Sequence, residues 1–228
     1  KYIAAQTPLY RQHRVEVLQR QGSSWRLQAV TPEGPCSVTA QGIVLAIPAP
    51  QVLPLLPPLP EADEMAAAIA RVTFEPCFSA MVGYGGPVDD ISSLGLQSPT
   101  PVLRWVGFEA AKRPMERVIL TLQSSMTFAQ QALDWPLAEV AACLVKSAET
   151  LSQVAALGAP QWQQGHRWRY AFCQQPCPQS CLARPDLALA CCGDWCRPHQ
   201  NVGAVETALR SGEAAATAIA AALSDSRG

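Results

Sequence analysis

The chain has 228 residues, of which 49% are hydrophobic and 15% charged, a composition typical of a folded globular protein. Its 17 basic and 18 acidic side chains leave a net charge of −1, so we expect neither nucleic acid nor a membrane surface as a partner. No apolar run approaches the about 20 residues that span a bilayer, and the first ten residues lack the apolar region of a signal peptide.

Residues 14–47 are predicted to form strands. Hydrophobic and polar side chains alternate on both sides of a turn at 21–24, as in a hairpin, and a second turn follows at 32–35. The run 42–48 is apolar up to its terminal proline, which is typical of a strand buried on both faces of a parallel sheet. Residues 1–47 are therefore predicted to form a β-meander followed by a strand of a Rossmann-type sheet.

The composition changes at residue 48, where a proline-rich segment leads into a predicted helix at 61–71. Short β-branched and aromatic runs predict strands at 77–84, 103–108 and 117–123. Asp134 is a candidate N-cap for a helix whose apolar residues recur at helical spacing over 137–158. Residues 48–184 are thus expected to form a mixed α+β unit with an antiparallel sheet.

The last part, residues 185–228, is expected to return to the first domain. A buried-strand run at 187–192 leads directly into Gly193 and Asp194, and an alanine-rich helix follows a polar loop at 204–223. The predicted fold class is α+β. It combines an antiparallel-sheet domain carrying helices with remnants of a Rossmann-like domain: the meander, its strand, and the C-terminal strand and helix.

The segment around Gly193 and Asp194 carries the strongest chemical signal. A glycine at the end of a strand lets a ligand approach closely, and the aspartate can accept hydrogen bonds from ribityl or ribose hydroxyls. A helix that begins near Gly203 presents unpaired N–H groups and a partial positive charge, which suit a flavin ring that becomes negative on reduction. The alternative is a strand–loop–helix unit that packs for stability alone.

These residues resemble a known motif. The pattern G-D, a loop, then G-A-V-E-x-A-x-x-S-G-x-x-A-A over 193–216 resembles the C-terminal flavin motif of the FAD-dependent amine-oxidase-like superfamily. Residues 44–51 resemble the strand that enters the substrate domain in renalase-like oxidoreductases, and the HRWRYA segment at 166–171 resembles one in bacterial, cyanobacterial and plant members of that group. The turn at 112–114 is similar to a Lys-Pro turn of that group with an arginine inserted. The resemblance covers nearly the whole chain.

The resemblance implies an FAD-dependent oxidoreductase that passes a hydride from a reduced small organic substrate to flavin and then to oxygen. A dihydronicotinamide is the leading substrate class and an amine the runner-up, while no catalytic residue and no oligomeric state follow. Residues 1–47 and 185–228 would belong to an FAD-binding domain, and residues 48–184 would bind the substrate. The implied cofactor-binding residues are Gly193, Asp194, Gly203, Ala204 and Val205.

The resemblance places the strand at 166–170 on the substrate face of the flavin, with Trp168 and Tyr170 as pocket residues. The alternative is a solvated strand whose basic side chains, such as Arg167, are exposed while its aromatic side chains pack inward. By analogy with amine oxidases, Lys112 could hold a water near flavin N5, although a lysine in a turn usually faces solvent. His199, in the loop before the last helix, could touch the cofactor through backbone groups.

The sequence lacks the dinucleotide fingerprint of the family, because no G-x-G-x-x-G follows a strand and opens a helix. The chain also begins at Lys1 without a methionine, so we expect an upstream segment to carry the motif and the chain alone to bind FAD poorly. A truncated, non-catalytic binding module is the alternative.

Six of the nine cysteines lie within 173–196, at spacings of C-x3-C-x3-C and C-C-x3-C. Zinc knuckles use paired C-x2-C, and adjacent Cys191 and Cys192 would point to opposite faces of a strand. We therefore expect no metal site. An odd number of cysteines without framework spacing favours free thiols and a cytoplasmic location.

Overall fold

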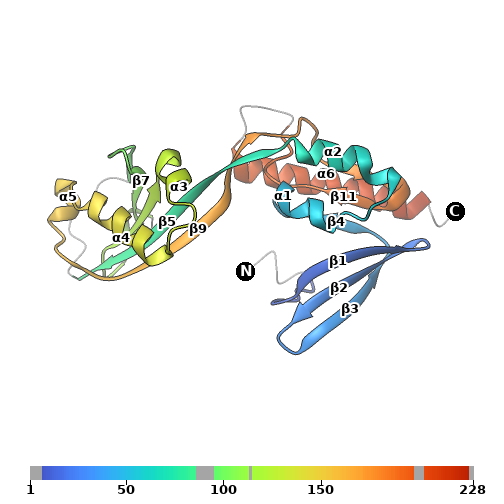
Figure 1. Cartoon of the computed structure of the whole chain (residues 1–228), viewed down its shortest axis with the longest axis horizontal. Helices are drawn as coiled ribbons and strands as arrows, with labels where there is room; N and C mark the ends of the chain where they lie inside the picture. Colours follow the sequence, from blue (N-terminus) through green and yellow to red (C-terminus); the bar gives the residue numbers. More distant parts are fainter. Residues whose placement is uncertain (1–6, 86–94, 113–114, 198–202, 226–228) are drawn as a thin grey trace. The chain divides into compact units, whose positions relative to one another are not determined.

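Residues 7–85, 95–112, 115–197 and 203–225 are described by the structure, a computed structural model, and the chain forms two units (Figure 1). Unit 1 comprises Lys1–Thr73 and Gln175–Gly228, and unit 2 comprises Phe74–Gln174. The chain crosses between the units within two strands, β5 (Thr73–Tyr84) and β9 (Pro160–Gln175).

The unit boundaries differ from the divisions expected after residues 47 and 184. Residues 48–73 belong with unit 1 because their helix α2 (Asp63–Ala70) packs there, where the Met65 sulfur lies 3.7 Å from the Cys191 sulfur. Residues 175–184 belong there because they include β10 (Leu182–Arg184), which pairs with β11 (Leu189–Cys191). The Met65–Cys191 contact spans 126 positions in sequence, so local composition does not reveal it.

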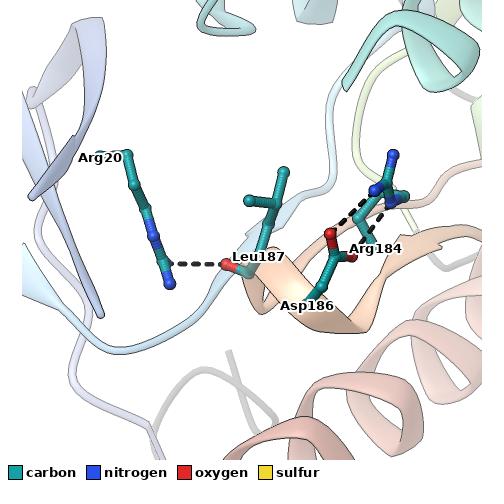
Figure 2. A network of polar contacts seen from close by, with 4 residues as sticks. All are labelled: Arg20, Arg184, Asp186 and Leu187. Carbon is teal, nitrogen blue, oxygen red and sulfur yellow. Dashed lines mark hydrogen bonds and ion pairs between the residues drawn. The ribbon is translucent and has the colours of Figure 1, made fainter. Parts of the chain in front are cut away.

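The expected meander forms an antiparallel sheet of β1 (Arg14–Gln21), β2 (Ser24–Thr31) and β3 (Gly34–Ala40). Its anchor is Trp25, whose side chain is fully buried and whose Nε1 donates a hydrogen bond to the Leu187 carbonyl at 2.8 Å. The same carbonyl accepts a hydrogen bond from Arg20 at 2.9 Å, next to the Arg184–Asp186 pair (Figure 2). The sheet is therefore tied to the short helix η5 (Pro185–Leu187).

A second sheet of unit 1 has the order β10-β11-β4, in which β4 (Ile43–Leu45) runs parallel to β11. Both predicted buried strands are shorter than their apolar runs. After β4 the chain enters α1 (Ala49–Val52), η2 (Leu53–Leu55) and η3 (Pro60–Ala62). Before β11 the η5 turn ends at Ala188, whose φ of 49° is incompatible with a strand.

The long helix α6 (Ala204–Asp225) packs on this second sheet, as the alanine-rich sequence predicts. Ala215 and Ile219 pack against Ala190 and Cys192. A Cβ at Gly42 would lie 2.8 Å from the Ile219 side chain, so this glycine permits the close approach of α6 to the sheet.

Unit 2 contains a five-stranded sheet of order β6-β7-β8-β5-β9, whose remaining members are β6 (Gly95–Gln97), β7 (Leu103–Phe108) and β8 (Ile119–Ser124). Helices α3 (Met126–Gln131), α4 (Leu137–Ala148) and α5 (Ser152–Ala155) contribute to one apolar core on one face of the sheet. The expected mixed α+β unit with an antiparallel sheet is present.

Two details of the predicted helix over 137–158 are wrong. The helix ends at Ala148, and the chain resumes helical structure only in α5. Asp134 is not the N-cap, because Pro136 occupies that position without a side-chain hydrogen bond. The short helix η4 (Glu109–Ala111) follows β7. Within the described part of the chain, no helix is long and apolar enough to cross a membrane.

Candidate functional site

The buried side of α6 is a stripe with one residue at every fourth position. Thr207, Ser211, Ala215 and Ile219 are all buried, so the stripe is small and polar near the start of the helix and apolar further along. Small side chains let the first turns of α6 lie close to the segment that follows β11. The Gly193 N–H donates a hydrogen bond to the Ser211 hydroxyl at 3.1 Å, which joins the two segments.

Contacts within the protein itself require a glycine at position 193. A Cβ there would lie 2.6 Å from Nε1 of Trp195, and the backbone has a φ of 157°. Trp195 is fully buried, and its Nε1 donates a hydrogen bond to the Ile47 carbonyl at 3.0 Å. The turn after β11 is therefore fixed to the end of β4 by an indole. The predicted role of Gly193 in ligand approach stays a prediction.

Asp194, in the same turn, is a half-buried carboxylate. Burial raises the pKa of Asp194 above its ordinary value, while the charge of Arg197 partly opposes that rise. Among the described residues its carboxylate makes no ion pair and no side-chain hydrogen bond. The carboxylate accepts a hydrogen bond from its own backbone N–H, and its remaining acceptor capacity in a partly desolvated turn suits hydroxyl donors supplied by a ligand.

Two buried polar atoms lie on either side of residues 198–202 in sequence, and neither has a hydrogen-bond partner among the residues that the structure describes. They are Nε of Arg197 and Oγ1 of Thr207. Buried polar atoms in folded proteins are nearly always satisfied, so unsatisfied ones indicate a missing partner such as a ligand. These atoms and the Asp194 carboxylate fit the ribityl, ribose and phosphate groups of a flavin nucleotide. His199 lies outside the described residues.

The start of α6 is open. Gly203, Ala204 and Val205 are exposed, and a Cβ at Gly203 would meet no atom of the described residues within 4 Å. The side chain of Glu206 pairs with Arg210 on the same helix, which explains this glutamate without a ligand. The predicted cofactor residues thus lie in one turn and in one helix start that Gly193 and Ser211 connect, and there is free space next to Gly203.

The second candidate surface lies on unit 2. On β5, Ala80 and Val82 face the helices, so Ser79, Met81 and Gly83 point to the opposite face. We call this opposite side the aromatic face, because it carries Trp105, Trp162 and Trp168 together with Met81.

Two indole rings of the aromatic face pack directly against glycines of the strands. A Cβ at Gly83 would overlap Trp162, and one at Gly107 would overlap Trp105. Glycine inside a strand weakens the sheet unless another group must approach closely, and here the indole rings do so. Strand glycines opposite tryptophans are the sequence signal that could have revealed this face, and our sequence reasoning missed Trp105, Trp162 and Met81.

Trp168 lies on the aromatic face, is 50% exposed, and donates a hydrogen bond from Nε1 to the Ser79 hydroxyl at 3.1 Å. The expectation of inward aromatic and outward basic side chains holds for His166, which is exposed, but not for Trp168 or Arg167. Arg167 instead faces the helix side, where it lies over Phe78 and donates a hydrogen bond to the Trp135 carbonyl. The Tyr170 ring makes an edge contact with Phe74.

Lys112 is exposed, as a lysine in a turn usually is, and an ion pair holds its ammonium group next to this sheet. Its Nζ lies 2.8 Å from a carboxylate oxygen of Glu109 and 5.2 Å from the centre of the Trp105 ring. The same Glu109 oxygen accepts a hydrogen bond from the Thr121 hydroxyl at 2.9 Å. The next two residues of the predicted turn, 113–114, lie outside the described residues.

None of the nine cysteines, all of which lie in the described residues, is part of a disulfide. In the described ranges, no group of three or more histidine, cysteine, aspartate or glutamate side chains is arranged to hold a metal ion. Trp168 and Tyr170 belong to unit 2, whereas the predicted cofactor residues belong to unit 1.

The family profile for flavin containing amine oxidoreductases matches residues 1–220. The chain belongs to this family. The predicted flavin-dependent oxidoreductase class and the FAD cofactor are therefore confirmed at the level of the family.

Three solved structures have a similar fold. A putative protoporphyrinogen oxidase from Exiguobacterium sp. 255-15 is 13% identical, with a TM-score of 0.54, over 91% of this chain and 46% of its own. Cyclohexylamine oxidase from Brevibacterium oxydans IH-35A is 17% identical, with a TM-score of 0.62, over 92% and 48%. A double mutant of putrescine oxidase is 14% identical, with a TM-score of 0.60, over 91% and 48%. The chain thus spans just under half the length of each, and at these identities the likeness concerns the fold alone.

Proposed function

We propose that the chain is part of an FAD-dependent oxidase that takes a hydride from a small, reduced organic substrate and passes the electrons to oxygen. Membership of the flavin-containing amine oxidoreductase family supports the reaction class. Two proteins of similar fold are named as oxidases of cyclohexylamine and putrescine, which is consistent with oxidase chemistry.

One observation carries the assignment of the flavin to unit 1: Asp194 is half-buried, has a raised pKa, and has no side-chain partner in the described part of the chain. With FAD bound, the cofactor supplies the redox chemistry. Asp194 would then accept hydrogen bonds from ribityl or ribose hydroxyls, and the N–H groups at the start of α6 would face the part of the ring that becomes negative. The open space beside Gly203 leaves room for that ring.

The adenine half of FAD needs a dinucleotide fingerprint, which is absent from these 228 residues. We therefore propose that this half binds to a segment outside them, and that the chain alone binds FAD weakly.

The aromatic face supports a planar substrate. Exposed indoles offer stacking surfaces for a ring, and stacked or edge contacts with aromatic groups contribute about 0.5–1.5 kcal/mol beyond area burial. A dihydronicotinamide, as in renalase-like enzymes, is the substrate class that we propose first. An amine is the second candidate, because indole faces also attract cations. The free thiols and the near-neutral charge support a cytoplasmic enzyme whose partners are small molecules.

The test uses the full polypeptide as its gene encodes it. An oxidised flavin gives an absorbance band near about 450 nm, so a yellow protein supports the assignment. Anaerobic mixing with a dihydronicotinamide or with a primary amine should bleach this band, and the faster reductant identifies the substrate class. A protein that stays colourless under FAD titration would mean a non-catalytic binding module.

The aromatic face is tested by Trp168→Ala, which should raise KM for the substrate by about two- to tenfold. Trp135→Ala is the matched control, because its ring makes an edge contact with Phe128 away from that face. Equal effects from the two variants would remove the aromatic face from substrate binding.

A further inference from the structure

Two thiols of unit 1 are paired by the backbone. Cys177 and Cys196 form a parallel β-bridge, in which the Cys177 N–H donates to the Trp195 carbonyl and the Arg197 N–H donates to the Cys177 carbonyl, each at 2.8 Å. Paired strands lie about 4.8 Å apart. This spacing is inside the range of about 4.4–6.8 Å between Cα atoms of disulfide-bonded cysteines.

The two thiols differ in acidity. A hydrogen bond between the side chains lowers the pKa of Cys177 to about 6, although burial opposes this, and the same contact together with burial raises the pKa of Cys196. Deprotonation therefore begins at Cys177, and Cys196 keeps its proton and donates it to the thiolate. The Gln179 side-chain carbonyl lies 2.8 Å from the Cys177 sulfur, and rotation of that amide would offer its NH₂ group to a thiolate.

Access to the pair is limited to small molecules. Cys177 is 3% exposed and Cys196 1%, so a bulky oxidant cannot reach either sulfur. Gln179, which contacts the Cys177 sulfur, also lines a cavity of about 340 Å³ together with Cys181 and Met65. An oxidant the size of hydrogen peroxide in this cavity is one side chain away from Cys177.

We propose that Cys177 and Cys196 form a reversible disulfide when the protein meets hydrogen peroxide. The Cys177 thiolate attacks one peroxide oxygen, the O–O bond breaks, and the departing hydroxide takes up a proton to become water. The Cys196 thiol then attacks the resulting sulfenic acid, which forms the S–S bond and releases a second water. Two thiols are oxidised and one peroxide is reduced to two waters.

The bridge would tie residue 177 covalently to the turn that carries Asp194 and Trp195. Peroxide is also the product expected when an oxidase reduces oxygen, but the disulfide does not depend on the proposed function, because added peroxide serves equally well.

Cys181 competes with Cys196 as the disulfide partner of Cys177. It is four residues from Cys177 and partly exposed, and its pKa is raised by burial and by the charge of Cys177. Cys181→Ser is therefore the matched control for Cys196→Ser.

The experiment treats the full polypeptide, reduced beforehand, with about one equivalent of hydrogen peroxide. Thiols are then counted after denaturation, and peptides are mapped by mass spectrometry. We expect the loss of two thiols per chain, a cross-linked peptide pair containing residues 177 and 196, and full recovery with dithiothreitol. Cys181→Ser should behave like the wild type, whereas Cys196→Ser should yield no such pair.

The pH dependence gives a second measurement that needs no variant. The rate of thiol loss should reach half its maximum near pH 6 and stay flat through pH 7–8, because it follows the thiolate fraction of Cys177. A cross-link between residues 177 and 181 in the wild type, thiol loss without any 177–196 pair, or a rate that rises only above about pH 8 would overturn the proposal.

Discussion

Replacing Asp194 with asparagine should weaken FAD binding while stabilising the flavin-free protein. A hydrogen bond to a charged group contributes about 1.5–3 kcal/mol, and one between neutral groups about 0.5–1.5 kcal/mol. Asparagine keeps an acceptor oxygen but loses the charge, so we expect a loss of about 1–2 kcal/mol. This corresponds to a dissociation constant about 5- to 30-fold higher. Alanine, which removes the acceptor as well, should cost about 1.5–3 kcal/mol.

The stability effect has the opposite sign. The pKa of Asp194 is raised by burial above the ordinary 3.8, so the folded flavin-free protein holds this proton to a higher pH than the unfolded chain does. The stability associated with the protonated form is present below about pH 3.8 and is lost as the pH rises through the raised folded pKa. At pH 7 the buried charge is a cost, and Asp194→Asn should raise the apparent Tm. Below about pH 3.8 the two proteins should melt alike.

Calorimetric FAD titration from pH 4 to pH 8 and thermal melts from about pH 3 to pH 8 measure both effects. Wild-type affinity should fall at acidic pH as Asp194 becomes protonated, whereas the affinity of the variant should change little. Asp186→Asn is the control, because Asp186 is an exposed carboxylate whose pKa is lowered by its hydrogen bonds with Arg184. It should leave FAD affinity unchanged. If Asp194→Asn keeps both the wild-type dissociation constant and its pH dependence, Asp194 serves the fold and not the cofactor.

Three further changes test other parts of the structure. Gly203→Val should leave the Tm of the flavin-free protein unchanged, because the added Cβ meets no atom of the described residues. It should lower the flavin midpoint potential and slow reduction by moving the ring away from the N–H groups of α6, and an unchanged potential at saturating FAD would refute this placement. Gly107→Val should displace the Trp105 indole that covers it, seen as a shift in tryptophan emission and a higher KM, and a silent variant would contradict that packing. Trp25→Phe removes one of the two donors to the Leu187 carbonyl, which Arg20 still satisfies. It should lower the free energy of unfolding by about 0.5–1.5 kcal/mol in urea titrations, with a change within error as the contrary outcome.

Local patterns predicted the elements that depend on local physics. The strand over 103–108 was predicted to the residue, because its run of alternating and aromatic side chains lies between proline- and glycine-containing loops. The start of α6 at residue 204 was equally clear, since alanine-rich sequence has strong helix propensity. Both elements would form these structures in many contexts.

Tertiary contacts determine the features that the local patterns did not predict. The apolar run 187–192 looks like one strand, yet its first residue completes the η5 turn that accepts hydrogen bonds from Arg20 and Trp25, more than 160 positions away in sequence. The alternation at 166–170 shows that Arg167 and Trp168 point to opposite faces, but not which face the helices cover. That choice depends on α3 and α4, which pack on the other side of the sheet from Trp168.

The first turns of α6 are hard to explain as a packing element alone. A helix selected only for packing would place apolar side chains inward and polar ones outward. Here Thr207 is buried and its hydroxyl has no hydrogen-bond partner in the described part of the chain, while Val205 and Leu209 are 86% and 61% exposed. An unsatisfied buried hydroxyl costs about 1–3 kcal/mol, and the half-buried charge of Asp194 adds a further cost. If α6 served packing alone, nothing in the described part of the chain would offset these costs. A bound flavin nucleotide, with hydroxyl donors for Asp194 and an apolar ring for the exposed start of the helix, would offset them together. This is why we favour the flavin over packing as the reason for the sequence at 193–207.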